Sequence, residues 1–435
     1  MSTVTSFRPR TRRNIELVLL LLAIVIVLMA YLNVGLAMDG KFPPDLLKYG
    51  FGLLVLSVGF HLVLRWRASY ADPLMLPIAT LLNGLGLVMI HRLDLAYGRT
   101  GSRLLEPKQL IWSALAVVIA AGVIIVLHDH RQLRRFTFTA MALGLGMLLL
   151  PLVPGIGRNI NGSRIWIGIG PLSFQPGEVA KILLVIFFAG YLVQTRDVLS
   201  LVGRRFMGIS LPRAKDLGPI LIAWLASVGV LVFEKDLGSS LLFCAGSYLA
   251  YLLFGHVQAR VLLWLHPFSD QALAISDQLV KGLMGMAKGG LLGSGLGRGH
   301  PEFTYFPESD FIIPSFGEEL GLIGVFALLL LYVLLVERGL RTALGVRDGF
   351  GKLLAVGLSF SLALQCFVVV GGVTRAIPLT GLTMPFLSYG GSSLLANWSL
   401  VAILLRISDQ ARRPLPDSEE LATAAEARTQ VVRLQ

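Results

Sequence analysis

The ionisable residues that could do chemistry in this chain stand at the ends of long apolar segments. Ionisable groups at membrane depth are costly, so they usually pair, face a polar cavity or take part in a reaction. Each one alone is best explained as a helix-end ion pair, but together on one face of a membrane they predict a polar cavity. The candidates are Glu178, Lys181, Glu234, Lys235, Asp236, Glu308, Asp310, Glu318, Glu319 and Arg375.

Asp310 has the surroundings that best suit a catalytic carboxylate. It lies between an aromatic loop segment that begins at Tyr305 and an apolar segment that begins at Phe311. Partial burial there should raise the pKa of Asp310, and the neighbouring Glu308 carboxylate should raise it further. A carboxyl pKa shifted toward neutrality suits a general base. We therefore expect Asp310 to be the chemically active residue of the cavity.

The glycine-rich stretch 289–299 has two interpretations of equal weight. Backbone amides exposed by glycine can line an anion such as a lipid diphosphate, or the stretch can be a plain flexible turn. Nucleotide binding is not expected, because the Lys-Ser/Thr ending of a phosphate-binding loop is missing and no strand precedes it. The two cysteines, Cys244 and Cys366, lie inside apolar blocks, so they predict neither a disulfide framework nor a metal site.

The elements that must position these residues are mostly apolar segments. Of its 435 residues 55% are apolar and only 15% are charged, and the mean hydropathy is +0.73; a soluble domain has about a quarter charged residues. A helix needs about 20 mostly apolar residues to cross a bilayer, and only helices satisfy their own backbone there. The sequence therefore predicts an all-α, polytopic transmembrane helix bundle. The eleven apolar blocks are 15–36, 47–65, 74–91, 109–127, 136–153, 178–194, 217–233, 238–255, 319–337, 352–372 and 384–405.

The positive charges behind the net charge of +12 lie in the loops between the apolar blocks, so they do not predict a nucleic-acid-binding surface. Arginines gather in alternate loops, a pattern that predicts cytoplasmic N- and C-termini, and contact with anionic lipids explains such charges better than nucleic acid does. The stretch 92–108 is an exception, because it is basic although it falls on the outer side. The first apolar block is too long for a cleaved signal peptide and lacks a small-residue cleavage site, so we expect it to be retained.

Three regions are expected along the chain, and their boundaries are implied by the family resemblance described below. Residues 1–70 form a two-helix N-terminal extension, residues 71–407 form the main membrane domain, and residues 408–435 form a polar cytoplasmic tail. Within the membrane domain, 256–317 is a large outer loop. A loop of that length is usually functional or disordered, and its Gly and aromatic content favours function.

Several motifs, in order along the chain, resemble one known family. They are Asn161-Gly162-Ser163-Arg164-Ile165-Trp166, Phe174-Gln175-Pro176-Gly177-Glu178, Asp236-Leu237-Gly238, Glu308-Ser309-Asp310-Phe311, Gly317-Glu318-Glu319-Leu320-Gly321, Pro378-Leu379-Thr380-Gly381 and Pro385-Phe386-Leu387-Ser388-Tyr389-Gly390-Gly391-Ser392-Ser393. From about residue 72 to 406 the chain resembles the SEDS family (shape, elongation, division and sporulation), which includes RodA, FtsW and SpoVE. The N-terminal extension is similar to that of RodA-type proteins of actinobacteria. The same similarity includes two motifs that follow the extension, Asn83-Gly84-Leu85-Gly86-Leu87 and His91-Arg92-Leu93-Asp94.

The resemblance implies a peptidoglycan glycosyltransferase of the bacterial plasma membrane. Such an enzyme polymerises lipid II onto an undecaprenyl-linked glycan, in elongation or division, with a class B penicillin-binding protein as partner. Asp310 matches the family's essential aspartate and would be the base. Arg298 or Lys181 would offset the diphosphate charge, with a divalent cation as an option and no protein metal site. The remaining candidate substrate-binding residues are Arg164, Trp166, Gln175, Glu178, Glu308, Glu319, Arg375, Ser388 and Ser392.

The chain departs from the family pattern in four places. Ile165 stands where an arginine usually precedes Trp166, Glu234-Lys235 replaces Gln-Pro before Asp236, and Glu308-Ser309 replaces His-Thr before Asp310. In addition, 239–254 offers one apolar block where the family has two helices. Counting crossings from either end then gives inconsistent sides. Either block 238–255 is re-entrant, or a weak segment near Val261–Leu265 contributes, or one family helix is missing here, and we favour the loss.

Two other functions remain alternatives. A lipid II flippase would also have many helices, some broken, with acidic residues near the midplane. A non-catalytic activator of a penicillin-binding protein would tolerate a lost crossing. Acidic residues clustered at one face favour the enzyme, whereas acidic residues spread along a central path would favour the transporter.

Overall fold

The computed structural model describes residues 11–160, 163–169, 172–200, 205–206, 209–210, 218–219, 221–222 and 255–414. Within them, nine helices are long and apolar enough to cross a membrane. They are α1 (Arg13–Met38), α2 (Leu46–Arg67), α3 (Met75–Ala96), α4 (Glu106–Val126), α5 (Thr137–Leu149) with its flanking 3-10 turns, α6 (Gly177–Ser200), α13 (Ile312–Gly345), α14 (Gly349–Val373) and α15 (Gly391–Arg412). The predicted helical membrane bundle is confirmed.

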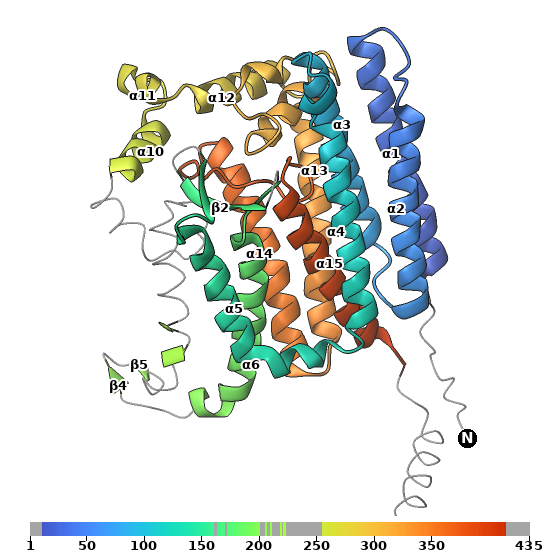
Figure 1. Ribbon diagram of the computed structural model, residues 1–435, viewed down its shortest axis with the longest axis vertical. Coiled ribbons are helices and arrows are strands. Elements are labelled where there is room, and N and C mark those ends of the chain that lie inside the picture. Colours follow the sequence, from blue (N-terminus) through green and yellow to red (C-terminus); the bar gives the residue numbers. More distant parts are fainter. Residues whose placement is uncertain are drawn as a thin grey trace, which may run out of the picture.

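These nine helices match nine of the eleven predicted blocks. The other two blocks, 217–233 and 238–255, lie largely outside the described residues, and so does the stretch 239–254 in which a family helix is predicted to be missing. The described helix α6 ends near the start of α14, where Gly349 faces Val193, whereas α10 (Gly255–Leu265) lies at the opposite end of the bundle (Figure 1).

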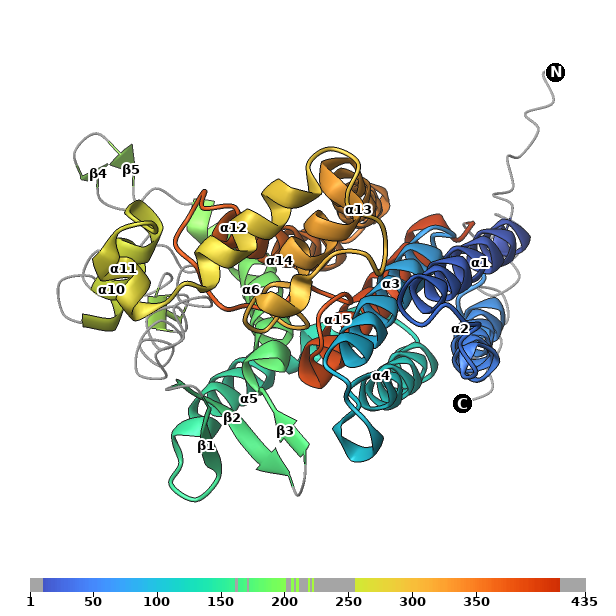
Figure 2. The ribbon, with the colours of Figure 1, turned by 90° about the horizontal axis from the view of Figure 1, so that it is seen from above.

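Helices α3 and α15 form the centre of the bundle (Figures 1 and 2). In each, 83% of the apolar window is buried, against 22% for the peripheral α2. Helix α15 packs along α4, α1 packs along α3, α5 packs along α6, and α13 packs along α14. Burial on all sides explains why α3 and α15 hold polar residues that pair inside the protein rather than face lipid.

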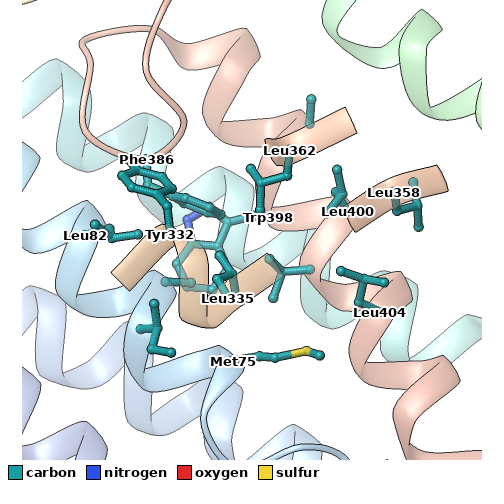
Figure 3. Packing of buried hydrophobic residues seen from close by; sticks show 14 of the residues in the cluster. Met75, Leu82, Tyr332, Leu335, Leu358, Leu362, Phe386, Trp398, Leu400 and Leu404 are labelled. Carbon is teal, nitrogen blue, oxygen red and sulfur yellow. The ribbon is translucent and has the colours of Figure 1, made fainter. Parts of the chain in front are cut away.

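An aromatic contact in the core fixes the loop before α15. Trp398 of α15 is fully buried between Phe60 and Phe386, whose ring centroids lie 5.9 and 5.7 Å away in edge-on geometry. Figure 3 shows Trp398 and Phe386 next to Tyr332, whose hydroxyl donates a hydrogen bond to the carbonyl of Pro385. Edge-on aromatic pairs stabilise by about 0.5–1.5 kcal/mol beyond the area they bury. The packed core therefore holds the 384–390 loop in place.

Non-spanning elements gather at the end of the bundle where α13 begins (Figure 1). They include α10, α11 (Asp270–Ile275), α12 (Gln278–Gly289) and the 3-10 turns η1 (Gly101–Arg103) and η4 (Pro301–Phe303). An antiparallel sheet of β1 (Gly157–Ile160), β2 (Ser163–Ile169) and β3 (Leu172–Phe174) lies at the same end, with Ile167 paired to Phe174. The short strands β4 (Arg205–Phe206) and β5 (Ile209–Ser210) pair with each other.

The glycine-rich stretch 289–299 packs against a break in α13. At Gly321 the backbone has φ 67°, which interrupts the helix. The amides of Leu322 and Ile323 donate to the carbonyls of Gly290 and Leu291, and those of Ser294 and Gly295 donate to the carbonyls of Glu318 and Glu319. The stretch thus supplies the backbone partners that the broken helix lacks. The amides of Ser294 and Gly295 are therefore not available to an anion, and anion binding by the rest of the stretch stays a prediction.

The two ends of the described chain meet at the other end of the bundle. Arg13 of α1 bonds to Glu16 and to the carbonyl of Ala71, while Arg412 of α15 pairs with the buried Asp72. The first and last described helix ends therefore share one side, opposite to α10–α12.

Candidate active site

A cavity of about 1300 Å³ opens at the end of the bundle that carries α10–α12. Five segments form its walls: the α3–α4 connection with the start of α4, strands β2 and β3, helices α10–α12, the loop before α13, and the loop between α14 and α15. The polar and aromatic lining residues are Arg99, Ser102, Lys108, Trp112, Trp166, Ser173, Gln175, Arg260, Trp264, Ser276, Gln278, Phe306, Glu308, Ser309, Asp310, Thr380, Thr383 and Tyr389.

Asp310 lies in the wall of this cavity. It directly precedes Phe311, the N-cap residue of α13. Burial is the main reason that the pKa of Asp310 rises to about 7. A backbone hydrogen bond, the positive charge of Arg260 and a hydrogen bond with Gln278 oppose this rise, and the Glu308 carboxylate adds to it. The direction agrees with the one expected from the sequence. Near neutral pH the side chain can therefore both accept and release a proton.

The loop that carries Asp310 is held by the loop before α15. The Ser388 hydroxyl donates to the carbonyl of Ser309 at 2.6 Å, and the amide of Tyr389 donates to the carbonyl of Glu308 at 2.7 Å. On the other side, the Ser315 hydroxyl donates to the carbonyl of Pro307 at 3.1 Å. Backbone after Asp310 is bonded too, since the amide of Phe311 donates to the carbonyl of Phe306 at 3.3 Å. The position of Asp310 therefore follows the packed core described above.

Among the described residues, three cationic side chains line the cavity from two directions: Arg99, Lys108 and Arg260. Arg99 lies 3.1 Å from both Asp94 and Glu308. Burial disfavours its charge, but the hydrogen bonds to Asp94 and Glu308 raise the pKa of Arg99 overall. Arg260 donates to the carbonyls of Leu379 and Thr380 at 3.1 and 3.3 Å. Cations so arranged suit an anionic ligand with more than one charged group.

Aromatic side chains and hydroxyls complete the wall. Trp166 lies on β2, Trp112 on α4 and Trp264 on α10, where its indole N–H donates to the carbonyl of Arg375 at 3.0 Å. A few polar groups among apolar and aromatic side chains are typical of a pocket for an organic ligand. The cavity thus combines a carboxyl group of near-neutral pKa, cations and flat apolar surfaces.

Four of the residues singled out in the sequence lie in the cavity wall: Trp166, Gln175, Glu308 and Asp310. Three others support it. The Ser392 hydroxyl accepts a bond from the amide of Gln175 at 2.8 Å, Ser388 holds the Asp310 loop, and Arg375 donates to the carbonyls of Trp264 and Leu265.

Of the remaining candidates, Glu234, Lys235 and Asp236 lie outside the described residues. The described ones are not part of the cavity wall. Lys181 pairs with Glu178 at 2.7 Å and with Gln365 at 2.6 Å near the start of α6. Glu319 is buried against Arg92, with 2.5 Å between Oε1 and Nε. Arg298 is exposed on the glycine-rich stretch. Arg164 lies on β2, but its side chain is outside the described residues. The structure therefore gives the cavity other cations than the predicted Arg298 and Lys181.

Sequence reasoning missed several wall residues. Arg99 and Lys108 had a signal, because the stretch 92–108 is basic on the outer side, where loops are usually less so. Arg260 and Gln278 had none, since their role depends on how α10 and α12 lie across the end of the bundle. Among the described residues, no group of three or more His, Cys, Asp or Glu side chains could hold a metal ion.

The chain is similar to proteins of one family along most of its length. A family model described as cell cycle protein, covering FtsW, RodA and SpoVE proteins, matches residues 73–255 and 245–413. Peptidoglycan glycosyltransferase RodA of Mycobacterium tuberculosis is 48% identical, over 95% of each chain. Stage V sporulation protein E of Bacillus subtilis is 33% identical, over 80% of this chain and 99% of that protein.

The alignment with the mycobacterial protein also leaves some positions without a residue in this chain. The alignment is 446 positions long and includes 95% of the 435 residues of this chain. Roughly 33 alignment positions therefore lack a residue here, which is more than the about 20 residues of one membrane span. The two segments that the family model matches overlap at residues 245–255. The predicted loss of one family helix stays a prediction, because the comparisons do not place these positions along the chain.

A solved structure shares the arrangement of helices. The crystal structure of Rod shape determining protein RodA from Thermus thermophilus is 27% identical, with a TM-score of 0.55, and covers 80% of this chain and 98% of that one. Together with the family-model match and the 48% identity, this shows that the chain belongs to the FtsW/RodA/SpoVE family of cell cycle proteins.

Proposed function

We propose that this chain is a peptidoglycan glycosyltransferase that polymerises lipid II into glycan strands. The observation that carries the proposal is Asp310, whose pKa of about 7 suits a base, in a cavity lined by three cations and three tryptophans. The name of the mycobacterial relative, peptidoglycan glycosyltransferase, supports the same activity.

In the proposed reaction Asp310 removes the proton from the acceptor sugar hydroxyl. The hydroxyl oxygen then forms a bond to the anomeric carbon of the donor glycan, and the bond from that carbon to undecaprenyl diphosphate breaks. The diphosphate leaves with the electron pair, and the proton stays on Asp310 until solvent or the leaving group takes it. General bases of matched pKa accelerate such steps by about 10²–10⁴-fold.

Arg99, Lys108 and Arg260 would offset the negative charge that develops on the departing diphosphate. Positively charged groups that are already in place for the transition state contribute strongly to catalysis. Both substrates carry a lipid-linked diphosphate, which fits cations on two sides of the cavity. A divalent cation held by the diphosphate itself is the alternative, and dependence of the rate on added Mg²⁺ or Mn²⁺ after chelation distinguishes the two.

The position of the cavity argues against a flippase. A transport path needs polar groups at depth along the bundle, whereas Asp310, Glu308, Arg99 and Lys108 lie at one end, outside the ends of the spanning helices or in their first turn. A mere activator of a penicillin-binding protein would not need a carboxyl group of near-neutral pKa inside a cavity. The enzyme accounts for both features.

The proposed function also predicts how the chain is oriented in the membrane and which kind of protein is its partner. The cavity end faces outward in the bacterial plasma membrane, where lipid II is presented, and both chain ends are cytoplasmic, as the arginine-rich loops indicate. A class B penicillin-binding protein would crosslink the new strands.

Lipid II polymerisation in detergent tests the proposal. The purified chain, with its penicillin-binding protein partner, should convert lipid II into glycan in micelles. Micelles have no separate leaflets, so transport between leaflets cannot account for the product. Polymer that depends on this chain supports the enzyme. Absence of polymer, combined with lipid II scrambling by the same protein in vesicles, would establish the flippase instead.

A further inference from the structure

Two segments of α3 have no part in the proposed reaction, although both stand out in the sequence. The first is the glycine pair Gly84 and Gly86. A Cβ on Gly84 would lie 2.4 Å from Val27 of α1, and a Cβ on Gly86 would lie 2.4 Å from the carbonyl oxygen of Leu387. Helix α3 is therefore narrow enough at this level to contact both the N-terminal extension and the loop that holds Asp310.

The second segment, His91 to Asp94, ends α3 beside the cavity. Asp94 is fully buried, and its Oδ2 accepts bonds from the amides of Leu105 and Glu106 at 2.7 and 2.9 Å. A carboxylate is favoured at that position, because it faces the positive end of α4. Its other oxygen lies 3.1 Å from Arg99, which in turn lies 3.1 Å from Glu308. Asp94 thus joins the start of α4 to the cavity wall.

His91 and Glu106 extend this chain of contacts to α1. The Nδ1 atom of His91 lies 2.6 Å from Glu106 Oε2 and 3.1 Å from the Tyr31 hydroxyl. The rings of Tyr31 and His91 are stacked with 4.2 Å between centroids, and Tyr31 is only 4% exposed. Buried polar groups in such a network are strongly interdependent. Tyr31 lies before residue 73, outside the family-model match.

We propose that Tyr31 of the N-terminal extension is a positioning residue for the candidate active site. Through His91 and Glu106 it holds the start of α4, and through Asp94 it fixes Arg99 against Glu308 at the cavity wall. The inference rests on the proposed function, and it gives the extension a role in polymerisation rather than in membrane insertion alone.

A loss of this support has a defined effect on the reaction. Without its position against Glu308, Arg99 binds the substrate diphosphate less well, so the KM for lipid II rises. The Glu308 carboxylate is then less neutralised and raises the pKa of Asp310 further, so the rate begins to rise at a higher pH. The other groups that act on Asp310 are Arg260 from α10 and Gln278 from α12, which the change does not touch.

The test is a double-mutant cycle of Tyr31→Phe and Arg99→Met. Tyr31→Phe removes one buried hydroxyl, for which we expect a rise in KM of about 3–10-fold, the effect of one hydrogen bond. It should have little further effect in the Arg99→Met background. Tyr49→Phe, a neighbouring tyrosine on α2 whose ring lies 6.0 Å from that of Tyr31, is the matched control and should leave KM unchanged.

Two readouts separate this inference from the proposed function. The cycle is measured both in polymerisation kinetics and in the melting temperature of the purified protein. If the parent makes no glycan, the proposed function fails, but coupling of Tyr31 and Arg99 in melting temperature still decides the inference. Additive effects in both readouts overturn it. So does a Tyr31→Phe variant with lower kcat, unchanged KM and an unchanged pH profile, because that result indicates a purely structural role.

Discussion

At the scale of single residues, the account depends on the protonation of Asp310. Because its pKa is about 7, the base is protonated below that value and ionised above it. Polymerisation should therefore rise as pH rises through about 7 and then level off. Glu308→Gln removes the neighbouring negative charge, so the midpoint should move to lower pH. Initial rates between pH 5 and 9 measure both, and an unmoved midpoint would contradict the electrostatic argument.

Asp310 should also cost the protein stability. Its pKa is raised in the folded state, so the ionised form is disfavoured by folding, and stability should fall as pH rises from the unfolded pKa toward 7. Asp310→Asn removes this penalty and should melt at the same temperature as the parent or higher at pH 8, as is common at active sites. Thermal denaturation in detergent measures it, and a clearly lower melting temperature would show that Asp310 is structural.

The cations of the cavity can be compared with the one predicted from the sequence. Arg260→Met should raise the KM for lipid II about tenfold or more, because a charged contact to the substrate is lost. Arg298→Met is the matched control and should have little effect, since the structure exposes Arg298 away from the cavity wall. Michaelis kinetics of the two variants measure the difference. A larger effect at Arg298 would favour the original sequence-based hypothesis.

At the scale of helices, the close approach of α3 to the Leu387 backbone is the contact most sensitive to volume. Gly86→Ala would place a methyl group 2.8 Å from the Cα of Leu387, and overpacking of this kind costs about 1–3 kcal/mol. The displaced loop carries Ser388, so activity should fall together with the melting temperature.

Gly122→Ala on α4 is the control for that substitution. Nothing lies within 4 Å of a Cβ at Gly122, so alanine should stabilise α4 slightly, by about 0.5–1 kcal/mol. Equal melting temperatures for Gly86→Ala and Gly122→Ala would show that α3 can move away from Leu387 at no cost.

The helices and the cavity differ in how far the sequence predicts them. Apolar blocks predicted seven of the nine described spans to within six residues, because membrane crossing demands long apolar runs wherever they lie. The ends of α13 and α15 differ from the predicted blocks by seven or eight residues. The cavity cations depend on contacts such as that between Arg99 and Glu308, which are 209 residues apart. No local pattern encodes such a contact; it follows from how α3, α4 and the loop before α13 pack. The break in α13 at Gly321 is a second case. The sequence does not reveal that the glycine-rich stretch packs against this break, and only the three-dimensional structure does.

At the scale of the whole molecule, the cavity and the chain ends should lie on opposite sides of the membrane. In a variant without Cys244 and Cys366, a cysteine introduced at the exposed Ser102 should react with a membrane-impermeant maleimide added to intact cells. A cysteine introduced at Arg131, whose side chain is 60% exposed at the other end, should react only after the cells are opened. The reverse labelling pattern would contradict the proposed orientation.

The central claim is that this chain forms the glycosidic bond with Asp310 as base, even though roughly 33 positions of its mycobacterial relative have no counterpart here. The most direct measurement is the rate of lipid II polymerisation by the parent and by Asp310→Asn, purified with the same partner. We expect glycan from the parent and at least about a 100-fold lower rate from the folded variant. Equal rates would contradict it.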